Sequence, residues 1–156
     1  MQGIVTMGSQ LRRATPDDAA AVRALVRAAY AKWIPVMGRE PRPMRADYDQ
    51  AVREHLVTLL IIDKSLIGVI ELVVEPDAVL IENIAVLPDH TGRGYGHALM
   101  SYAREVAQSL GHKRLWLYTN KLMAENIAFY QRLGYAIDRE EGTRDWGQVV
   151  YMSMSI

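Results

Sequence analysis

A glycine-rich turn between an apolar run and a helix-like segment constrains the fold more than any other feature. Glycines stand at positions 92, 94 and 96, shortly after the apolar residues 79–87. Glycine permits a sharp backbone turn and lets N–H groups approach a ligand closely. The helical spacing that follows predicts a helix here, whose N-terminal amides and dipole favour an anion. With Arg93, whose guanidinium suits phosphate oxygens, the segment predicts a pyrophosphate site between a strand and a helix.

The composition predicts one soluble domain. A chain of 156 residues, half of them hydrophobic, can bury a substantial core. Lys and Arg total 18, equal to Asp and Glu, which argues against nucleic acid as a partner. No apolar run reaches the roughly 18 residues of a membrane span. We expect a single cytoplasmic domain over residues 1–156, with residues 1–10 as a disordered extension and Met7 as an alternative start.

Cysteine and histidine restrict the chemistry further. The chain has no cysteine, so a disulfide, a thiolate nucleophile and a thiolate metal site are all excluded. Absence of cysteine also suits the reducing cytoplasm. The four histidines lack the spacing of metal ligands, and we therefore expect no metal.

Hydrophobic periodicity predicts a mixed α/β domain. Strands are expected at residues 11–14, 56–62, 66–74, 78–86, 114–119, 135–139 and 148–154. Helices are expected at residues 16–32, 47–54, 93–110 and 124–133, with an irregular, proline-rich loop at 34–46. Short turns make the three strands before the glycines an antiparallel meander. The helix that follows makes the next pairing parallel.

The spacing of the glycines excludes two familiar nucleotide sites. A dinucleotide fold requires Gly-x-Gly-x-x-Gly and an acid at the end of the next strand, but here the spacing is Gly-x-Gly-x-Gly. The next strand ends in Leu117-Tyr118-Thr119-Asn120, which contains no acid. A Walker loop is absent as well, because no Gly-Lys-Ser/Thr follows.

Two segments together carry a family resemblance. Residues 86–100, followed by Asn-Ile-Ala-Phe-Tyr-Gln-Arg-Leu-Gly-Tyr at 126–135, resemble the GNAT superfamily of acyl-CoA-dependent N-acetyltransferases. The likeness spans nearly the whole chain in element order and is sharpest over residues 79–135. It implies a mixed, mostly antiparallel central sheet of six to seven strands flanked by about four helices. It also implies acetyl-CoA as the acetyl donor.

The resemblance assigns the coenzyme A contacts. The family pattern Gln/Arg-x-x-Gly-x-Gly/Ala falls on residues 91–96, with Thr91 in place of Gln or Arg. By resemblance, the pyrophosphate site comprises Thr91, Gly92, Arg93, Gly94, Tyr95, Gly96 and His97. A bulge in the preceding strand frees the backbone of Ile84, Ala85 and Val86 for the pantetheine amides. Asn126 is expected to bond the pantetheine chain, with Asn120 as a weaker alternative; the commoner family form has Asn where Met123 stands.

The resemblance nominates one catalytic group, and the apolar strands nominate two more. Tyr130 lies four residues before Gly134, at the family's general-acid position, although its helical spacing also fits a core tyrosine. Glu82 interrupts an apolar strand, which is costly unless it faces a cleft, and it is the candidate base. Glu71 is the rival base. Either glutamate could instead lie at an exposed strand end.

The loop at residues 34–46 is where relatives form the acceptor pocket. Trp33, Met37 and Met44 could wall such a pocket, with Glu71 nearby, while Arg39, Arg42 and Arg45 could receive an anionic group. A solvated loop is the alternative. The predicted activity is transfer of acetyl to a primary amine of a small-molecule or peptide acceptor. Direct attack in a ternary complex is expected, because no cysteine exists to carry the acetyl group.

Two other functions stay open at this point. One is a catalytically silent acyl-CoA-binding or regulatory module, against which Tyr130 and Glu82 argue. The other is a nucleotide-phosphate-binding module built on the same turn. The family resemblance also suggests a homodimer, although no residue pattern here determines the oligomeric state.

Overall fold

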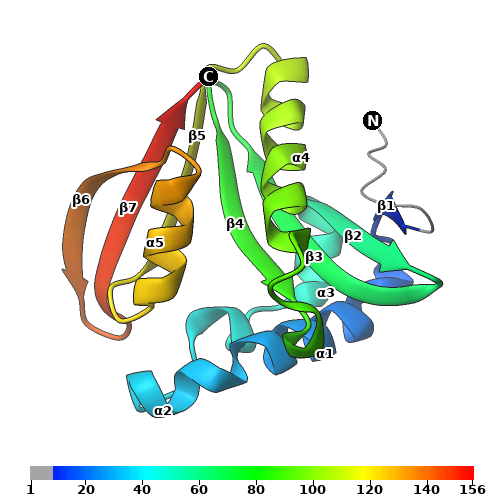
Figure 1. Cartoon of the computed structure of the whole chain (residues 1–156), viewed down its shortest axis with the longest axis horizontal. Coiled ribbons are helices and arrows are strands. Elements are labelled where there is room, and N and C mark those ends of the chain that lie inside the picture. The colour runs from blue at the N-terminus through cyan, green and yellow to red at the C-terminus, as the bar shows by residue number, and fades with distance from the viewer. Residues whose placement is uncertain (1–8) are drawn as a thin grey trace.

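A computed structural model describes residues 9–156 and contains one seven-stranded sheet flanked by helices (Figure 1). The strands are β1 (Ser9–Arg13), β2 (Leu56–Ile62), β3 (Ser65–Val74), β4 (Val79–Val86), β5 (Arg114–Asn120), β6 (Ala136–Thr143) and β7 (Gly147–Ser155). Their order in the sheet is β1-β2-β3-β4-β5-β7-β6, and of these pairings only β4–β5 is parallel. The predicted mixed, mostly antiparallel sheet is therefore confirmed.

Helices cover both faces of this sheet. They are α1 (Ala19–Tyr30), the single turn α2 (Ile34–Met37), α3 (Tyr48–Glu54), α4 (Tyr95–Ser109) and α5 (Ala124–Arg132). One core joins α4 and α5 to the sheet through residues such as Leu99, Tyr130 and Ile70. A second core, on the other face, joins α1 and α3 to Val69 and its neighbours. Adjacent residues of β3 thus enter opposite cores, as the alternation of a strand requires.

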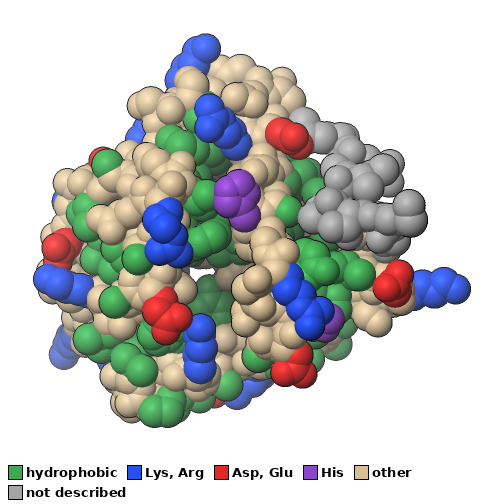
Figure 2. Space-filling model, viewed as in Figure 1, with side chains coloured by type: hydrophobic (Ala, Val, Ile, Leu, Met, Phe, Trp, Pro, Cys, Tyr) green, Lys and Arg blue, Asp and Glu red, His purple; other side chains and the backbone are tan. Residues whose placement is uncertain are grey.

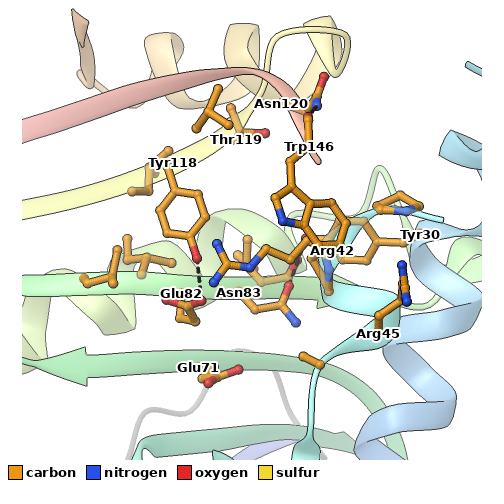
Figure 3. Close-up of a pocket in the computed structure, with 18 of the residues that line it drawn as sticks. Tyr30, Arg42, Arg45, Glu71, Glu82, Asn83, Tyr118, Thr119, Asn120 and Trp146 are labelled. Carbon is orange, nitrogen blue, oxygen red and sulfur yellow. Dashed lines mark hydrogen bonds between the residues drawn. The ribbon is translucent and has the colours of Figure 1, made fainter. Parts of the chain in front are cut away.

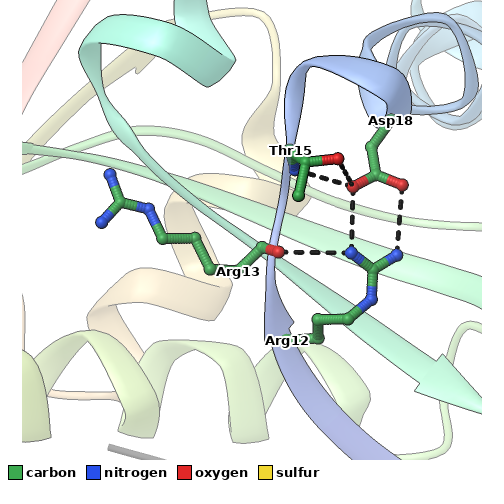
Figure 4. Close-up of polar contacts among 4 residues, drawn as sticks. All are labelled: Arg12, Arg13, Thr15 and Asp18. Atoms are coloured by element: carbon green, nitrogen blue, oxygen red, sulfur yellow. Dashed lines mark hydrogen bonds and ion pairs between the residues drawn. The ribbon is translucent and has the colours of Figure 1, made fainter.

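Polar contacts fix the junction between β1 and α1 (Figure 4). The Arg12 guanidinium donates to both carboxylate oxygens of Asp18, at 3.0 and 3.1 Å. The Thr15 backbone N–H donates to Asp18 Oδ2 at 2.7 Å, in the manner of a helix N-terminal box. The hydrogen bond from Arg12 is the main reason that the pKa of Asp18 falls to about 2. Strand β1 begins at Ser9, so residues 9 and 10 of the predicted disordered extension belong to a strand. Residues 1–8, which include Met7, lie outside the described part of the chain.

The segment at residues 34–46 is more ordered than predicted. It contains α2 and a 3₁₀ turn, η3 (Arg42–Arg45), instead of an irregular loop. The prediction of a loop was wrong because it took the prolines to end helical structure. Pro35 and Pro43 instead stand in the first turns of α2 and η3, where a missing N–H breaks no hydrogen bond. Similarly, the single helix predicted at residues 16–32 is α1 flanked by the 3₁₀ turns η1 (Pro16–Asp18) and η2 (Ala31–Trp33). No helix within residues 9–156 is long and apolar enough to cross a membrane.

Candidate active site

The site begins where two neighbouring strands part. Strand β4 pairs with β5 only from Val79 to Ile81, opposite residues 115–117. Beyond that point β4 keeps its pairing with β3, while β5 continues along β7 (Figure 1). The backbone of residues 82–86 therefore has no strand on its β5 side. An unpaired strand edge is where an extended ligand can add its own hydrogen bonds.

A β-bulge in β4 marks the parting of the strands. Leu72 pairs with Ile81 and Glu71 pairs with Asn83, so Glu82 is the extra residue. A bulge bends its strand and re-aims the side chains beside it. The bulge predicted from the family resemblance is present, and Glu82 itself occupies it.

A cleft of about 1200 Å³ opens between the parted strands. Figure 2 shows the molecule hollowed at this place, between the part built on β6 and β7 and the part built on β4. The predicted catalytic and acceptor-site residues that line it are Met37, Arg39, Glu71, Glu82 and Tyr130, and Asn126, predicted to bond the pantetheine chain, lines it as well. The fold thus brings together residues that are up to 93 positions apart, from Met37 to Tyr130.

Glu82 is held by a tyrosine from the opposite wall (Figure 3). The Tyr118 hydroxyl donates to Glu82 Oε1 at 2.5 Å, across the gap between β5 and β4. The Arg42 guanidinium lies over the Tyr118 ring, 5.4 Å from its centroid. Burial and the neighbouring carboxylate raise the pKa of Tyr118, which therefore stays a hydrogen-bond donor. The second carboxylate oxygen of Glu82 makes no hydrogen bond to a described residue.

Glu71 lines the same cleft but has a different partner. His55 Nδ1 lies 2.6 Å from Glu71 Oε2, and the glutamate is only 6% exposed. Burial raises the pKa of Glu71 above its usual value, an effect that His55 opposes. The result is a buried carboxyl whose basicity exceeds that of an ordinary glutamate.

Three polar residues that were not predicted hold β4 to the helices. The Tyr30 hydroxyl donates toward Asn83 Oδ1 (2.9 Å) and the Ile84 carbonyl (3.2 Å). Asn83 Nδ2 in turn donates to the Tyr48 hydroxyl at 3.1 Å, which donates to the Pro43 carbonyl at 2.6 Å. Only the polar Asn83 beside Glu82, in an otherwise apolar strand, could have signalled this network.

Tyr130 projects from α5 into the cleft with a buried side chain. Among the described residues its contacts are aromatic, with Phe129 at 5.5 Å and Tyr135 at 6.2 Å between ring centroids, and none hydrogen bonds to its hydroxyl. Burial raises the pKa of Tyr130 to about 12. The phenol is therefore protonated throughout the physiological range. Its ring packs in the core while it also lines the cleft, and the general-acid role stays a prediction.

The glycine-rich turn has the geometry of an anion site. Gly92 and Gly94 have φ angles of +75° and +84°, which side chains disfavour. Helix α4 starts one residue later than Gly94 and has no side-chain cap, which leaves its first N–H groups available. The Thr91 hydroxyl is already bound to the Pro88 carbonyl at 3.0 Å, so the backbone and Arg93 are the donors that remain. The turn therefore offers donors to an anion, and the pyrophosphate site stays a prediction.

Three of the predicted residues are placed differently from expectation. Met44, expected in a pocket wall, is buried at 3% exposure and is not among the described residues that line the cleft. Trp33 is buried at 6% exposure and is not among the described residues that line the cleft, because the chain stays helical around it. Asn120 donates to the Trp146 carbonyl at 2.6 Å and accepts from the Leu122 N–H, so both ends of its amide are occupied. Asn126, with only a weak contact to the Met123 sulfur at 3.7 Å, is the better placed of the two asparagines.

A strand that leaves its neighbour at a bulge and runs into an uncapped, glycine-led helix is the architecture of an acyl-CoA-dependent acetyltransferase. A model of the acetyltransferase (GNAT) family matches residues 20–135. The chain therefore belongs to the acetyltransferase (GNAT) family, which confirms the family predicted from the sequence.

Individual proteins agree with this assignment. Streptothricin acetyltransferase of Streptomyces lavendulae is 39% identical over 80 residues, which are 47% of this chain and 42% of that protein. The chain thus matches less than half the length of this curated relative. A PaiA N-acetyltransferase from Thermoplasma acidophilum, solved with coenzyme A, superposes with a TM-score of 0.78 at 17% identity, over 95% of this chain and 99% of that one. Nourseothricin acetyltransferase superposes with a TM-score of 0.73 at 24% identity, over 95% and 98%. These two structural likenesses establish the fold.

Proposed function

We propose that the protein transfers the acetyl group of acetyl-CoA to a primary amine of an acceptor that enters the cleft. The observation that carries this proposal is the unpaired β4 segment, residues 82–86, which borders a cleft containing both Glu82 and Tyr130. One edge of the site is thus suited to an extended donor, and two groups able to move protons stand beside it.

The donor site would be built on β4, the glycine-rich turn and α5. The first amides of α4, with Arg93, would hold the pyrophosphate, and the free backbone of Ile84, Ala85 and Val86 would pair with the pantetheine amides. Asn126 would bond the pantetheine chain. Tyr95 and Gly96 begin the helix, and His97 lies exposed in its first turn. When bound, acetyl-CoA supplies an activated thioester.

Proton movement falls to Glu82 and Tyr130. One carboxylate oxygen of Glu82 makes no hydrogen bond to a residue within 9–156, and it would accept the proton of the acceptor amine directly or through water. Tyr130, protonated because it is buried, would donate to the departing sulfur. Without cysteine in the chain, the amine would attack directly in a ternary complex. Glu71, held by His55, is the competing base.

The acceptor is proposed to be a small molecule or a peptide amine. Streptothricin acetyltransferase and nourseothricin acetyltransferase are named for small molecules, which supports the first of these. A homodimer and a cytoplasmic location also stay predictions. Sedimentation of the purified chain would test the first, and fractionation of the source cell would test the second.

Thiol release from acetyl-CoA across a panel of amines tests the activity. The assay has no background from the protein, since the chain contains no cysteine. We expect Glu82→Gln to lower kcat by about 10²- to 10⁴-fold, the usual contribution of a general base. Glu71→Gln is the matched variant and should keep most of kcat. The reverse order would make Glu71 the base.

Two outcomes would favour the other functions. Tight acetyl-CoA binding without thiol release for any amine would indicate a silent binding module. Tighter binding of NAD or ATP than of acetyl-CoA would indicate a nucleotide-binding module and contradict the proposal.

A further inference from the structure

Acidic and basic side chains from several elements line the cleft. Glu71 and Glu82 extend from β3 and β4, whereas Arg42 and Arg45 come from the segment after α2 (Figure 3). Arg39, from the same segment, lines the cleft as well. Asp47, Glu54 and Asp145 also line the cleft, and the Asp47 carboxylate caps α3 by accepting from the Gln50 N–H. Glu71 and Glu82 of the sheet therefore share one space with the arginines of the segment after α2.

Local structure directs two of the arginines to the same side. Arg42 and Arg45 are the first and last residues of the 3₁₀ turn η3, and residues three apart in such a turn lie over one another. Between them, Met44 is buried at 3% exposure, and its carbonyl accepts from Arg27 Nη1 at 2.9 Å. The Pro43 carbonyl accepts from Tyr48. The turn is thus anchored on one side and presents two cations on the other.

These cations have no carboxylate partner within the described residues. Arg42 lies over the Tyr118 ring, and Arg39 lies 6.0 Å from the centroid of the Trp146 ring. Neither they nor Arg45 forms an ion pair, although both Glu71 and Glu82 line the same cleft. An aromatic ring orients a guanidinium but does not neutralise it. A planar guanidinium group without a carboxylate partner among the described residues suits a carboxylate or phosphate of a ligand, which it can bind through two hydrogen bonds.

We propose that the acceptor carries an oxyanion, a carboxylate or phosphate, a few bonds from the amine that is acetylated, and that Arg42 binds this group. The proposal rests on the proposed acetyltransferase function and names the class of its acceptor. Arg42 contacts the same tyrosine that holds Glu82, so amine and oxyanion would sit on either side of Tyr118. Arg45 and Arg39 would add positive potential on the same wall.

Matched acceptor pairs test the proposal in thiol-release assays. Each α-amino acid of a panel is compared with its α-carboxamide, and phosphoethanolamine is compared with ethanolamine. The carboxamide has the less basic amine, so more of it is neutral at pH 7, and a preference for the carboxylate must overcome that advantage. We expect at least one anionic member to have a kcat/KM about 10- to 100-fold above its neutral partner, the worth of a charge-assisted hydrogen-bonded pair.

Substitutions then assign the preference to Arg42. Arg42→Gln should raise the KM of the anionic acceptor by about 10- to 100-fold and change that of the neutral partner by less than about threefold. Arg42→Lys, which keeps the charge but loses the planar fork, should fall between. Arg13→Gln, on the edge strand β1 and outside the cleft lining, is the control and should match the parent protein.

Equilibrium binding keeps the proposal falsifiable if no acceptor turns over. Calorimetry with the same pairs, in the presence of coenzyme A, measures affinity without chemistry. Equal affinities for anionic and neutral members, or equal losses for both on Arg42→Gln, would overturn the proposed acceptor class. Failure of acetyl-CoA to bind or react, by contrast, would overturn the proposed function itself.

Discussion

Replacement of Tyr130 by phenylalanine removes one hydroxyl from the cleft and leaves the packing intact. The hydroxyl makes no hydrogen bond to a described residue, so the free energy of unfolding should change by less than about 0.5 kcal/mol. If Tyr130 donates the proton to the departing sulfur, kcat should fall by about 10²- to 10⁴-fold. The KM for acetyl-CoA should change little, because the lost interaction belongs to the transition state.

The expected fall in kcat depends on how readily Tyr130 gives up its proton, and burial raises the pKa of this residue to about 12. A free thiol has a pKa of about 8.5, and a gap of about 3.5 corresponds to about 5 kcal/mol against complete transfer. The pKa of Tyr130 is high because burial destabilises its anion, however, and burial in the same cleft destabilises a thiolate as well. Transfer exchanges one buried anion for another, so the effective gap is smaller than the two pKa values imply. Because burial raises the pKa of Tyr130 to about 12, ionisation of this residue should not lower kcat below about pH 11.

Tyr135 supplies the matched control for this experiment. Its hydroxyl is buried and has no hydrogen-bond partner among the described residues, and its ring contacts that of Tyr130. Tyr135→Phe should therefore leave kcat unchanged and raise the free energy of unfolding by up to about 1 kcal/mol, measured in urea. A Tyr130→Phe enzyme with kcat within threefold of the parent would refute the acid role. An equal fall in kcat for Tyr130→Phe and Tyr135→Phe would indicate that altered packing of the two rings, and not loss of a proton donor, lowers the activity.

Two further predictions concern stability. Gly94→Ala should lower the free energy of unfolding by about 1–2 kcal/mol because Gly94 has a φ of +84°. Gly96→Ala, within α4, should raise it by up to about 1 kcal/mol because alanine favours a helix more than glycine does. Unfolding in urea measures both changes. Asp18→Asn should cost about 1 kcal/mol at pH 7, discounted because the partner guanidinium is exposed. The pKa of Asp18 is lowered on folding, so its contribution is present above pH 4 and lost as the pH falls to about 2, where melting temperatures of the two proteins should converge.

Periodicity and turn chemistry were sufficient to predict most of the fold. Apolar runs bounded by short turns located the strands, and the cap at Asp47, whose carboxylate accepts from the Gln50 N–H, correctly marked the start of α3. The prolines misled because a proline that begins a helix and one that ends it look alike in sequence. Trp33 misled because an aromatic residue near a loop fits a core as well as a pocket.

The partners within the site could not be predicted, because they depend on where pairing changes. Tyr118 lies two residues after Trp116 and on the same face of β5, as the period of a strand requires. Its contact with Glu82 exists only because β4 and β5 have parted at that level. A single-residue change of register moves every following side chain to the other face, and no local signal in the chain locates it.

The bulge at Glu82 also explains how two glutamates can share one cleft. In a regular pairing with Leu72 opposite Ile81, Glu71 would stand directly opposite Glu82, with Cβ atoms about 5 Å apart and two like charges facing one another. The bulge places Asn83 opposite Glu71 instead. Each carboxylate then has its own partner, His55 for Glu71 and Tyr118 for Glu82, and repulsion from Glu82 becomes the least of the influences on the pKa of Glu71. The extra residue that frees the strand edge for a donor therefore also separates the two candidate bases, which makes Glu82→Gln and Glu71→Gln separable in assays.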